Sequence, residues 1–156
     1  MKVSIITPTY NDEKTIISTL ETILSQSYDN WEWIIVNDGS TDNTEDIILE
    51  TIKEVGVEDK CKYIYQKNAD QLNAIITALD FVKGEFIFIL HSDDLLPDRK
   101  FIENCVKYMF SHKDIDGIFG DLVLIDSYGN IKGKQKIRKY KKRKSNNTLM
   151  LLWLGR

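Results

Sequence analysis

Residues 85–94 read Glu85-Phe86-Ile87-Phe88-Ile89-Leu90-His91-Ser92-Asp93-Asp94, and this segment is the most informative about the fold. Its first part is nearly all apolar, which is typical of a strand buried on both faces of a parallel sheet. Polar residues then begin abruptly, so the strand is expected to end at Leu90. We therefore predict an internal strand that delivers two neighbouring carboxylates at its carboxyl end.

The sequence on both sides of this strand alternates between strand-like and helix-like patterns. Apolar runs predict further strands at 3–7, 31–36 and 62–66 and within 115–125. Apolar residues at helical spacing predict helices at about 12–26, 42–55, 71–82 and 101–109. Alternation of this kind predicts an α/β fold, with a doubly wound, mostly parallel sheet and helices on both faces.

Several residues predict where these elements begin and end. Pro8 is expected to end the first strand, and Asp12 to cap the first helix. Gly56 and Gly84 are expected to end the second and third helices. Residues 127–130, Ser-Tyr-Gly-Asn, predict a hairpin turn after the last strand.

Three polar segments follow predicted strands, at residues 7–11, 37–42 and 91–94. Each has an ordinary structural interpretation, as a turn, a helix cap or an acidic helix start. The carboxyl ends of parallel strands lie at one edge of the sheet, where such folds bind their ligands. The occurrence of all three segments at that edge favours a binding site.

Asp93 and Asp94 predict a metal site within that edge. Adjacent carboxylates repel one another unless a cation joins them. Mg²⁺ and Mn²⁺ prefer oxygen ligands and commonly bind through one or two carboxylates together with phosphates and water. Such an ion would neutralise the charge that develops on a diphosphate leaving group.

The sequence resembles the family 2 inverting glycosyltransferases, which have the Rossmann-like GT-A fold. The resemblance covers roughly residues 1–130, and four segments carry it: residues 3–11, residues 34–42, the stretch from Ala78 into the fourth strand, and His91-Ser92-Asp93-Asp94 with Pro97 beyond. The family implies transfer of a sugar from a nucleotide diphosphate, expected to be a UDP-sugar, to a saccharide or lipid-linked acceptor. It also implies Mn²⁺ or Mg²⁺ as cofactor.

The resemblance also implies roles for particular residues. Tyr10 would stack near the base and Asp38 would accept a hydrogen bond from the base or ribose. Asp93 would be the main metal ligand, with Asp94 beside it supporting the metal or the donor sugar. The full set expected at the nucleotide sugar is Thr7, Pro8, Tyr10, Glu13, Asp38, Gln71, Ser92 and Asp93.

The sequence departs from the family pattern in three places. His91 stands where the family often has an acidic residue or asparagine, and it is interpreted as a structural histidine in preference to a metal ligand. Residues 70–73, Asp-Gln-Leu-Asn, match the family only loosely, so the resemblance assigns no phosphate contact to that loop. In the family, the acceptor-binding half with the carboxylate that serves as base ordinarily follows the segment that ends here at Arg156, so the resemblance implies a base beyond residue 156. Asp121 and Asp126, the only late carboxylates, are explained at least as well by strand polarity or turn capping.

The charge distribution predicts two regions of different character. Residues 132–156 hold ten of the 21 basic residues and none of the 24 acidic ones. We expect a nucleotide-sugar-binding domain at 1–131, and a basic segment with the start of an acceptor-side region at 132–156, the fold being truncated there. The basic run at 132–144 is either a solvated segment or a peripheral contact with an anionic membrane.

The remaining alternatives concern activity and partners. The chain is an enzyme or, alternatively, a catalytically incomplete nucleotide-sugar-binding module. Residues 149–154 form an apolar stretch that is expected to be exposed and could mediate a homodimer. No nucleic-acid-binding motif is present, nor the glycine motifs of dehydrogenases or P-loop hydrolases. Without an export signal or spanning segment, we expect a cytoplasmic protein, with the inner face of the membrane as the alternative location.

Overall fold

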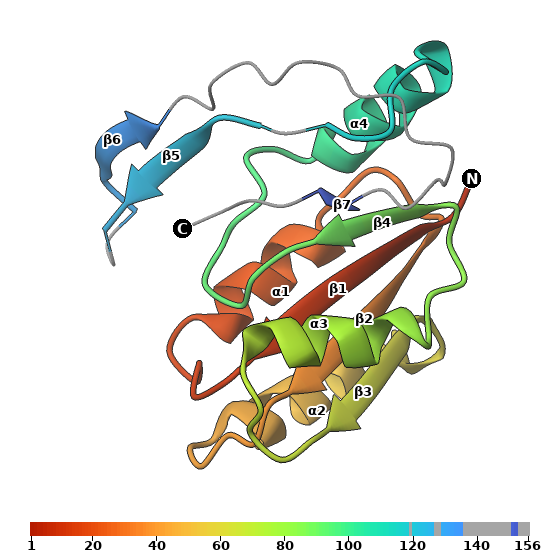
Figure 1. Cartoon of the computed structure of the whole chain (residues 1–156). Helices are drawn as coiled ribbons and strands as arrows, with labels where there is room; N and C mark the ends of the chain where they lie inside the picture. Colours follow the sequence, from red (N-terminus) through yellow and green to blue (C-terminus); the bar gives the residue numbers. More distant parts are fainter. Residues whose placement is uncertain (119, 127–128, 136–150, 153–156) are drawn as a thin grey trace.

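The computed structural model describes residues 1–118, 120–126, 129–135 and 151–152 (Figure 1). Its main sheet has five strands in the order β3-β2-β1-β4-β7, and every neighbouring pair is parallel. The strands are β1 (Val3–Thr9), β2 (Trp31–Asn37), β3 (Cys61–Tyr65), β4 (Phe86–Ile89) and β7 (Leu151–Leu152). The predicted parallel α/β fold is therefore confirmed, and β4 is an internal strand, as the apolar run at 85–90 predicts.

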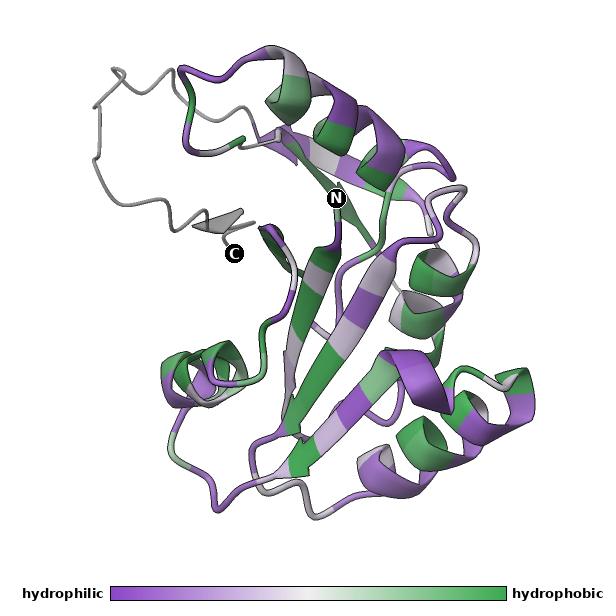
Figure 2. Cartoon of the chain, turned by 90° about the vertical axis from the view of Figure 1, so that its right-hand side faces the viewer, coloured by the Kyte–Doolittle hydropathy of each residue, from purple (hydrophilic) through white to green (hydrophobic). Residues whose placement is uncertain are grey.

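Helices cover both faces of the sheet, as expected for a doubly wound fold. The helices are α1 (Ile16–Leu24), α2 (Thr44–Val55), α3 (Gln71–Leu79) and α4 (Phe101–Ser111), with a short 3-10 helix at Glu58–Lys60. Side chains of α1, α2 and α4 share one hydrophobic cluster with the sheet, whereas those of α3 share a second cluster. Figure 2 shows hydrophobic and hydrophilic residues alternating along these helices, as amphipathic packing requires.

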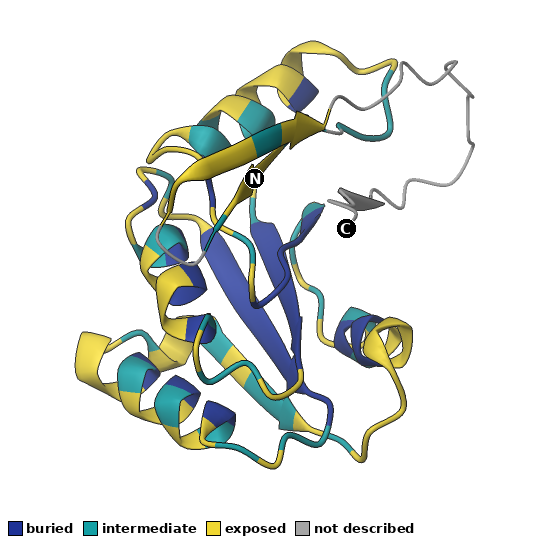
Figure 3. Ribbon diagram, turned by 90° about the vertical axis from the view of Figure 1, so that its left-hand side faces the viewer, coloured by how far each residue is buried: buried dark blue, intermediate teal, exposed yellow. Residues whose placement is uncertain are grey.

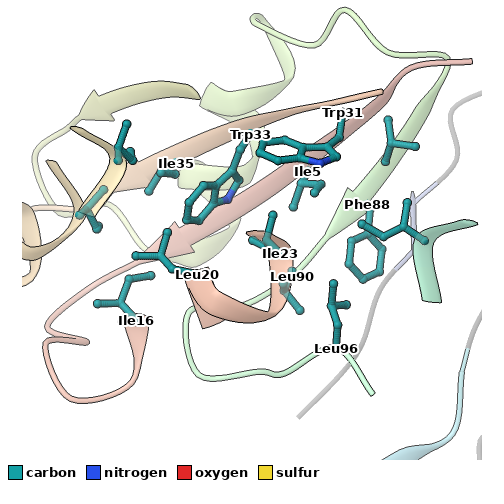
Figure 4. Close-up of a cluster of buried hydrophobic side chains, with 14 of the residues drawn as sticks. Ile5, Ile16, Leu20, Ile23, Trp31, Trp33, Ile35, Phe88, Leu90 and Leu96 are labelled. Atoms are coloured by element: carbon teal, nitrogen blue, oxygen red, sulfur yellow. The ribbon is translucent and has the colours of Figure 1, made fainter. Parts of the chain in front are cut away.

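The core lies around β1 and β2, whose residues are all buried (Figure 3). Successive side chains of a strand point to opposite faces, so Ile5 packs against α1 and α2 while Ile6 packs against α3. Trp33 is fully buried at the centre of the larger cluster, beside Leu20 and Ile35 (Figure 4). This burial on both faces holds the carboxyl ends of β1, β2 and β4 in fixed relative positions.

The prediction that Pro8 ends the first strand is wrong, because β1 continues to Thr9. The β1–β4 ladder stops at Ile6, whereas the β1–β2 ladder continues to Thr9. Backbone groups alternate between the two sides of a strand. Ile6 O accepts from Leu90 on the β4 side and Thr9 O accepts from Asp38 on the β2 side. Pro8 therefore turns its nitrogen to the side where β4 has already left the sheet, and no hydrogen bond is lost.

The predicted helix ends have mixed outcomes. Gly56 ends α2 in the left-handed conformation, with φ of 70°, as predicted. Asp12 does not cap α1, because that helix begins only at Ile16 and its N-cap residue is Thr15.

Gly84 does not end α3, which stops at Leu79. It instead lies against β1, where an added Cβ would approach Lys2 O and Ser4 N to 2.7 Å. Its backbone nitrogen donates to Ser4 Oγ at 2.9 Å. Close approach of two backbones, and not helix termination, is thus the reason for a glycine at this position.

The last predicted strand lies outside the main sheet. β5 (Leu122–Ile125) pairs antiparallel with β6 (Ile131–Gln135) in a separate two-stranded sheet. This pairing confirms a hairpin, although Ser127 and Tyr128 of the predicted turn lie outside the described residues. The predicted domain boundary after residue 131 falls inside β6. Residues 136–150 of the basic and apolar C-terminal stretches also lie outside the described residues.

Leu151 and Leu152 form β7 and pair in parallel with Ile87 and Phe88 of β4. The backbone of these two residues of the apolar stretch 149–154 therefore extends the main sheet. The rest of that stretch lies outside the described residues. Within the part of the chain that the structure describes, no helix has the length and apolarity needed to span a bilayer.

Candidate functional site

A pocket of about 320 Å³ lies at the carboxyl ends of β1, β2 and β4. Its size falls in the usual range for small-molecule sites, and its position is where parallel sheets bind ligands. The lining residues are Pro8, Thr9, Tyr10, Asp12, Asp38, Asn68, Asp70, Gln71, Ser92 and Asp93. The three polar segments singled out in the sequence therefore meet at one site.

Asp38 lies directly after β2 and is 3% exposed. Its Oδ1 accepts hydrogen bonds from Gln66 Nε2 at 2.7 Å and from the backbone nitrogen of Ala69 at 2.9 Å. Oδ2 accepts no hydrogen bond from the described residues. The carboxylate is thus held in a fixed orientation and retains one oxygen that can accept from a ligand.

The loop after β1 turns sharply at Asn11, whose φ of 55° is left-handed. Its backbone nitrogen donates to Ser40 Oγ at 3.0 Å, and its side-chain oxygen accepts from Thr41 N at 2.7 Å. These bonds join the loop after β1 to the loop after β2. Tyr10, one residue earlier, is 47% exposed at the pocket and presents an aromatic ring that a base could stack on.

Asp12 is a pocket residue that the sequence analysis missed. Its Oδ2 accepts from Thr9 Oγ1 at 2.9 Å, from the Tyr10 backbone nitrogen at 2.9 Å and from Ser92 Oγ. One carboxylate therefore connects the loop after β1 to the loop after β4. The sequence spacing could have indicated this. The first apolar residue of the helix, Ile16, lies four positions after Asp12, which is too far for Asp12 to be the N-cap residue.

The turn after β4 places the two neighbouring carboxylates differently. Asp93 is exposed and lines the pocket, whereas Asp94 is half-buried and does not. Thr19 Oγ1 of α1 donates to the backbone oxygens of Ser92 and Asp94, both at 2.9 Å, and so anchors the turn. The structure therefore brings Asp93, but not Asp94, to the other predicted residues.

The pocket residues can hold a divalent cation only if oxygen atoms of the bound nucleotide complete the coordination of the ion. Among the described residues, no group of three or more His, Cys, Asp or Glu side chains could hold a metal. Mg²⁺ and Mn²⁺ are commonly held by one or two carboxylates together with phosphate oxygens and water. Asp93 suits that mode of binding.

His91 is 4% exposed, and its Nδ1 lies 2.6 Å from Nε2 of Gln71. Gln71 lines the pocket and His91 does not. This burial fits the structural interpretation of His91 better than a role as metal ligand, because the imidazole supports a pocket residue from behind.

The loop before α3 contributes two further residues that the sequence analysis did not assign to the site, Asn68 and Asp70. Asp70 has φ of 78° and caps α3, its Oδ1 accepting from the backbone nitrogens of Leu72 and Asn73. Gly39 permits this loop to approach, because a Cβ there would lie 2.8 Å from Asn68 N. Thr9 is the remaining lining residue that the sequence analysis did not name.

Thr7 and Glu13 do not line the pocket, so the structure does not bring these two residues together with the other predicted ones. Thr7 is fully buried within β1, and its Oγ1 accepts from Trp33 Nε1 at 2.9 Å. Glu13 accepts from the backbone and side-chain nitrogens of Asn43 at 3.2 and 3.1 Å. Thr7 supports the core, and Glu13 joins the two loops on their outer side.

The late carboxylates have the structural roles that the sequence allows. Asp126 Oδ1 accepts from the Asn130 backbone nitrogen at 2.9 Å, and its Oδ2 pairs with Lys132 Nζ at 2.9 Å. It therefore closes the hairpin turn. Asp121 is exposed, and neither residue lines the pocket.

Comparison with known proteins identifies similar sequences along nearly the whole chain. The family model described as "Glycosyl transferase family 2" matches residues 4–154. The chain is 34% identical over 131 residues to the putative glycosyltransferase EpsE of Bacillus subtilis, covering 82% of this chain and 45% of that protein. It is 34% identical over 123 residues to the UDP-Glc:alpha-D-GlcNAc-diphosphoundecaprenol beta-1,3-glucosyltransferase WfgD of Escherichia coli, covering 72% and 46%. The chain thus spans less than half of the length of these relatives.

Solved structures show the same arrangement of elements. S. aureus TarS in complex with UDP superimposes with a TM-score of 0.67 and 26% identity, covering 76% of this chain and 35% of that chain. The mannosyltransferase PcManGT of Pyrobaculum calidifontis, in complex with GDP-Man and Mn²⁺, gives a TM-score of 0.64 and 29% identity, covering 69% and 32%.

Proposed function

Because the chain belongs to glycosyl transferase family 2, we propose that its pocket binds the nucleotide diphosphate of a sugar donor, and that the protein transfers this sugar to a saccharide or lipid-linked acceptor with inversion at the anomeric carbon. The observation that carries the proposal is the meeting of Tyr10, Asp38 and Asp93 in one pocket, although they follow three different strands. An aromatic ring, a buried acceptor and an exposed carboxylate match the base, the ribose and the metal-bound diphosphate respectively.

The pocket would hold the donor from two sides. Tyr10 stacks on the base, and Oδ2 of Asp38 accepts from the base or the ribose. We expect a UDP-sugar, which is supported by the UDP complex of the similar TarS chain. Pro8, Gln71 and Ser92 line the remaining wall.

Mn²⁺ or Mg²⁺ would be held by Asp93, with Asp94 next to it in the turn but outside the pocket. When bound, the ion neutralises charge on the departing diphosphate. The Mn²⁺ in the PcManGT complex supports a divalent cation here. Ser92, fixed by Asp12, orients the segment that carries Asp93.

A second candidate is a module that binds the nucleotide sugar without transferring it. Three of the four carboxylates that line the pocket, those of Asp12, Asp38 and Asp70, already accept hydrogen bonds from the protein. In this proposal these carboxylates position the loops and the nucleotide, and no pocket residue is assigned as the base for an acceptor hydroxyl. Release of UDP from a UDP-sugar by this chain would exclude the second candidate.

The proposed location is the cytoplasm, at the inner face of the membrane. The basic residues in 132–144 would attract anionic lipid, bringing the site to a lipid-linked acceptor. Such an acceptor is named for the related E. coli enzyme, whose acceptor is a diphosphoundecaprenol lipid. The division into a donor domain at 1–131 and an acceptor-side region from 132, and a homodimer through residues 149–154, remain proposals on the same sequence basis.

Titration calorimetry with UDP tests the donor site. We expect binding that requires Mn²⁺ and that weakens at least about tenfold in Asp93→Asn, because a charged metal ligand is lost. Asp59→Asn is the matched control, since Asp59 is exposed in the 3-10 helix before β3, at the other end of the sheet. Absence of heat with Mn²⁺, or metal-independent binding that is equal in Asp93→Asn and the wild type, would contradict the proposal.

A further inference from the structure

The β5–β6 hairpin exposes apolar side chains outside the core. No residue of either strand is buried. The exposed fractions are 49% for Val123, 52% for Leu124, 42% for Ile125 and 64% for Ile131. Figure 3 shows the hairpin as an exposed ribbon apart from the buried main sheet. A two-stranded hairpin alone is only marginally stable in water. A partner that buries these apolar side chains would stabilise it.

The strand register gathers three of these side chains on one face. Directly opposed residues of an antiparallel pair lie on the same face. Val123 is opposite Lys134, and Ile125 is opposite Ile131. The register shift between Leu124 and Ile125 leaves Lys132 as an extra residue on β6, so alternation along β5 still places Val123 and Ile125 on one face. This face, which we call the hairpin face, consists of Val123, Ile125, Ile131 and Lys134.

The described residues of the hairpin carry balanced charge, Asp121 and Asp126 against Lys132 and Lys134, and it is the sequence after β6 that is strongly basic. Lys134 is exposed on the face itself. The sequence continues from β6 into a run in which nine of the residues at 132–144 are Lys or Arg and none is acidic. A second copy of this chain would bring two such runs together, which repulsion disfavours. A surface that is apolar within and anionic at its boundary fits both features.

We propose that the hairpin face enters the interfacial region of an anionic bilayer, with Val123, Ile125 and Ile131 among the acyl chains and Lys134 at the phosphate headgroups. This inference rests on the membrane contact in the proposed function and deepens it, because a basic run alone binds weakly and reversibly. Apolar burial and electrostatic attraction together give a firmer peripheral attachment.

Flotation of the 156-residue chain with vesicles tests this proposal. The vesicles are phosphatidylcholine alone, or phosphatidylcholine with phosphatidylglycerol. We expect flotation only with the anionic vesicles. The double variant Val123→Thr/Ile131→Thr keeps β-branched side chains but loses apolar contact, so its partition should fall roughly tenfold. Lys134→Gln should lower partition about fivefold at low salt, with little effect at high salt.

Val55→Thr is the matched control, because Val55 is 50% exposed at the end of α2 and is not part of the hairpin. It should float as the wild type does. Equal flotation of the double variant and the wild type would overturn the role of the hairpin face while leaving the basic contact standing. Absence of wild-type flotation would overturn both. UDP calorimetry on the same samples reports donor-site binding independently of membrane binding. A variant that still binds UDP is also folded.

A label at Val123→Cys gives a second readout that does not depend on the double variant. Burial raises the pKa of Cys105 and raises that of Cys61 to about 12, so the native thiols react slowly at neutral pH. An environment-sensitive dye at residue 123 should shift to the blue on anionic vesicles only. Absence of a shift, or a dimer in sedimentation that the double variant dissociates, would overturn the proposal.

Discussion

The carboxylate of Asp12 joins two walls of the pocket, because the same oxygen accepts from Thr9, Tyr10 and Ser92. Asp12 therefore relates the ring that would stack on the base to the turn that carries Asp93. Asp12 would therefore affect binding of the nucleotide sugar in two ways. It lines the pocket itself, and it fixes groups on both sides of the bound nucleotide.

We predict that Asp12→Ala lowers the affinity for UDP with Mn²⁺ about tenfold, because three donors lose their acceptor and the two loops separate more easily. Glu13→Ala is the control, since Glu13 contacts Asn43 outside the pocket. Its affinity should change less than about twofold. Calorimetry measures both, and similar losses in the two variants would show that Asp12 has no particular role.

At the scale of the element, glycines test how closely β1 meets the segment before β4. Gly84→Ala should destabilise the protein by about 3 kcal/mol, because the added Cβ meets backbone atoms at 2.7 Å. Gly56→Ala should cost about 1 kcal/mol, because only its left-handed φ is unfavourable and nothing lies within 4 Å. Urea denaturation measures both, and equal losses would argue against close packing at Gly84.

The amino end of β2 predicts a pH dependence of stability. Burial alone would raise the pKa of Glu32, but hydrogen bonds from Lys2, Ser4 and the Lys83 backbone lower it below its ordinary 4.5. A lowered pKa stabilises the fold above that ordinary value, and the contribution is lost as pH falls through the folded value.

Glu32→Gln should therefore be less stable than the wild type by about 2 kcal/mol at neutral pH. The difference should shrink below about pH 4.5, as the wild-type carboxylate becomes protonated. Thermal unfolding across that pH range checks the prediction. A constant difference at every pH would mean that the charge of Glu32 contributes nothing.

The sequence predicts the elements better than it predicts their ends. Apolar periodicity marks strands and helices because burial determines it, and this gave the parallel fold and the places of Asp38 and Asp93. Ends depend on contacts with distant segments. Pro8 continues a strand only because β4 has already left its side, and Asp12 turns to Ser92 rather than to α1. Thr7 lies inside β1 and not in the loop for the same reason, since the strand runs two residues beyond it.

At the scale of the whole molecule, ligand binding should stabilise the fold. UDP at about one hundred times its dissociation constant, with Mn²⁺, should add about 2.7 kcal/mol to the free energy of unfolding. Chelation of the metal should remove most of this gain. Asp93→Asn at the same concentrations should show little response to Mn²⁺. Thermal melts with and without chelator measure the effect, and an increase that survives chelation would argue against a metal at this site.

The strand order has a consequence for how the protein folds. β1 lies between β2 and β4, yet β4 comes more than 80 residues after the start of β1. Strand pairs so far apart in the sequence form late, because the chain loses the entropy of loop closure before the pair gains any stabilising contact. A nascent chain can thus pair β1 with β2 early, but the pocket proposed to bind the nucleotide is complete only when β4 docks. The rate at which UDP binding returns during refolding would therefore measure the rate at which β4 docks.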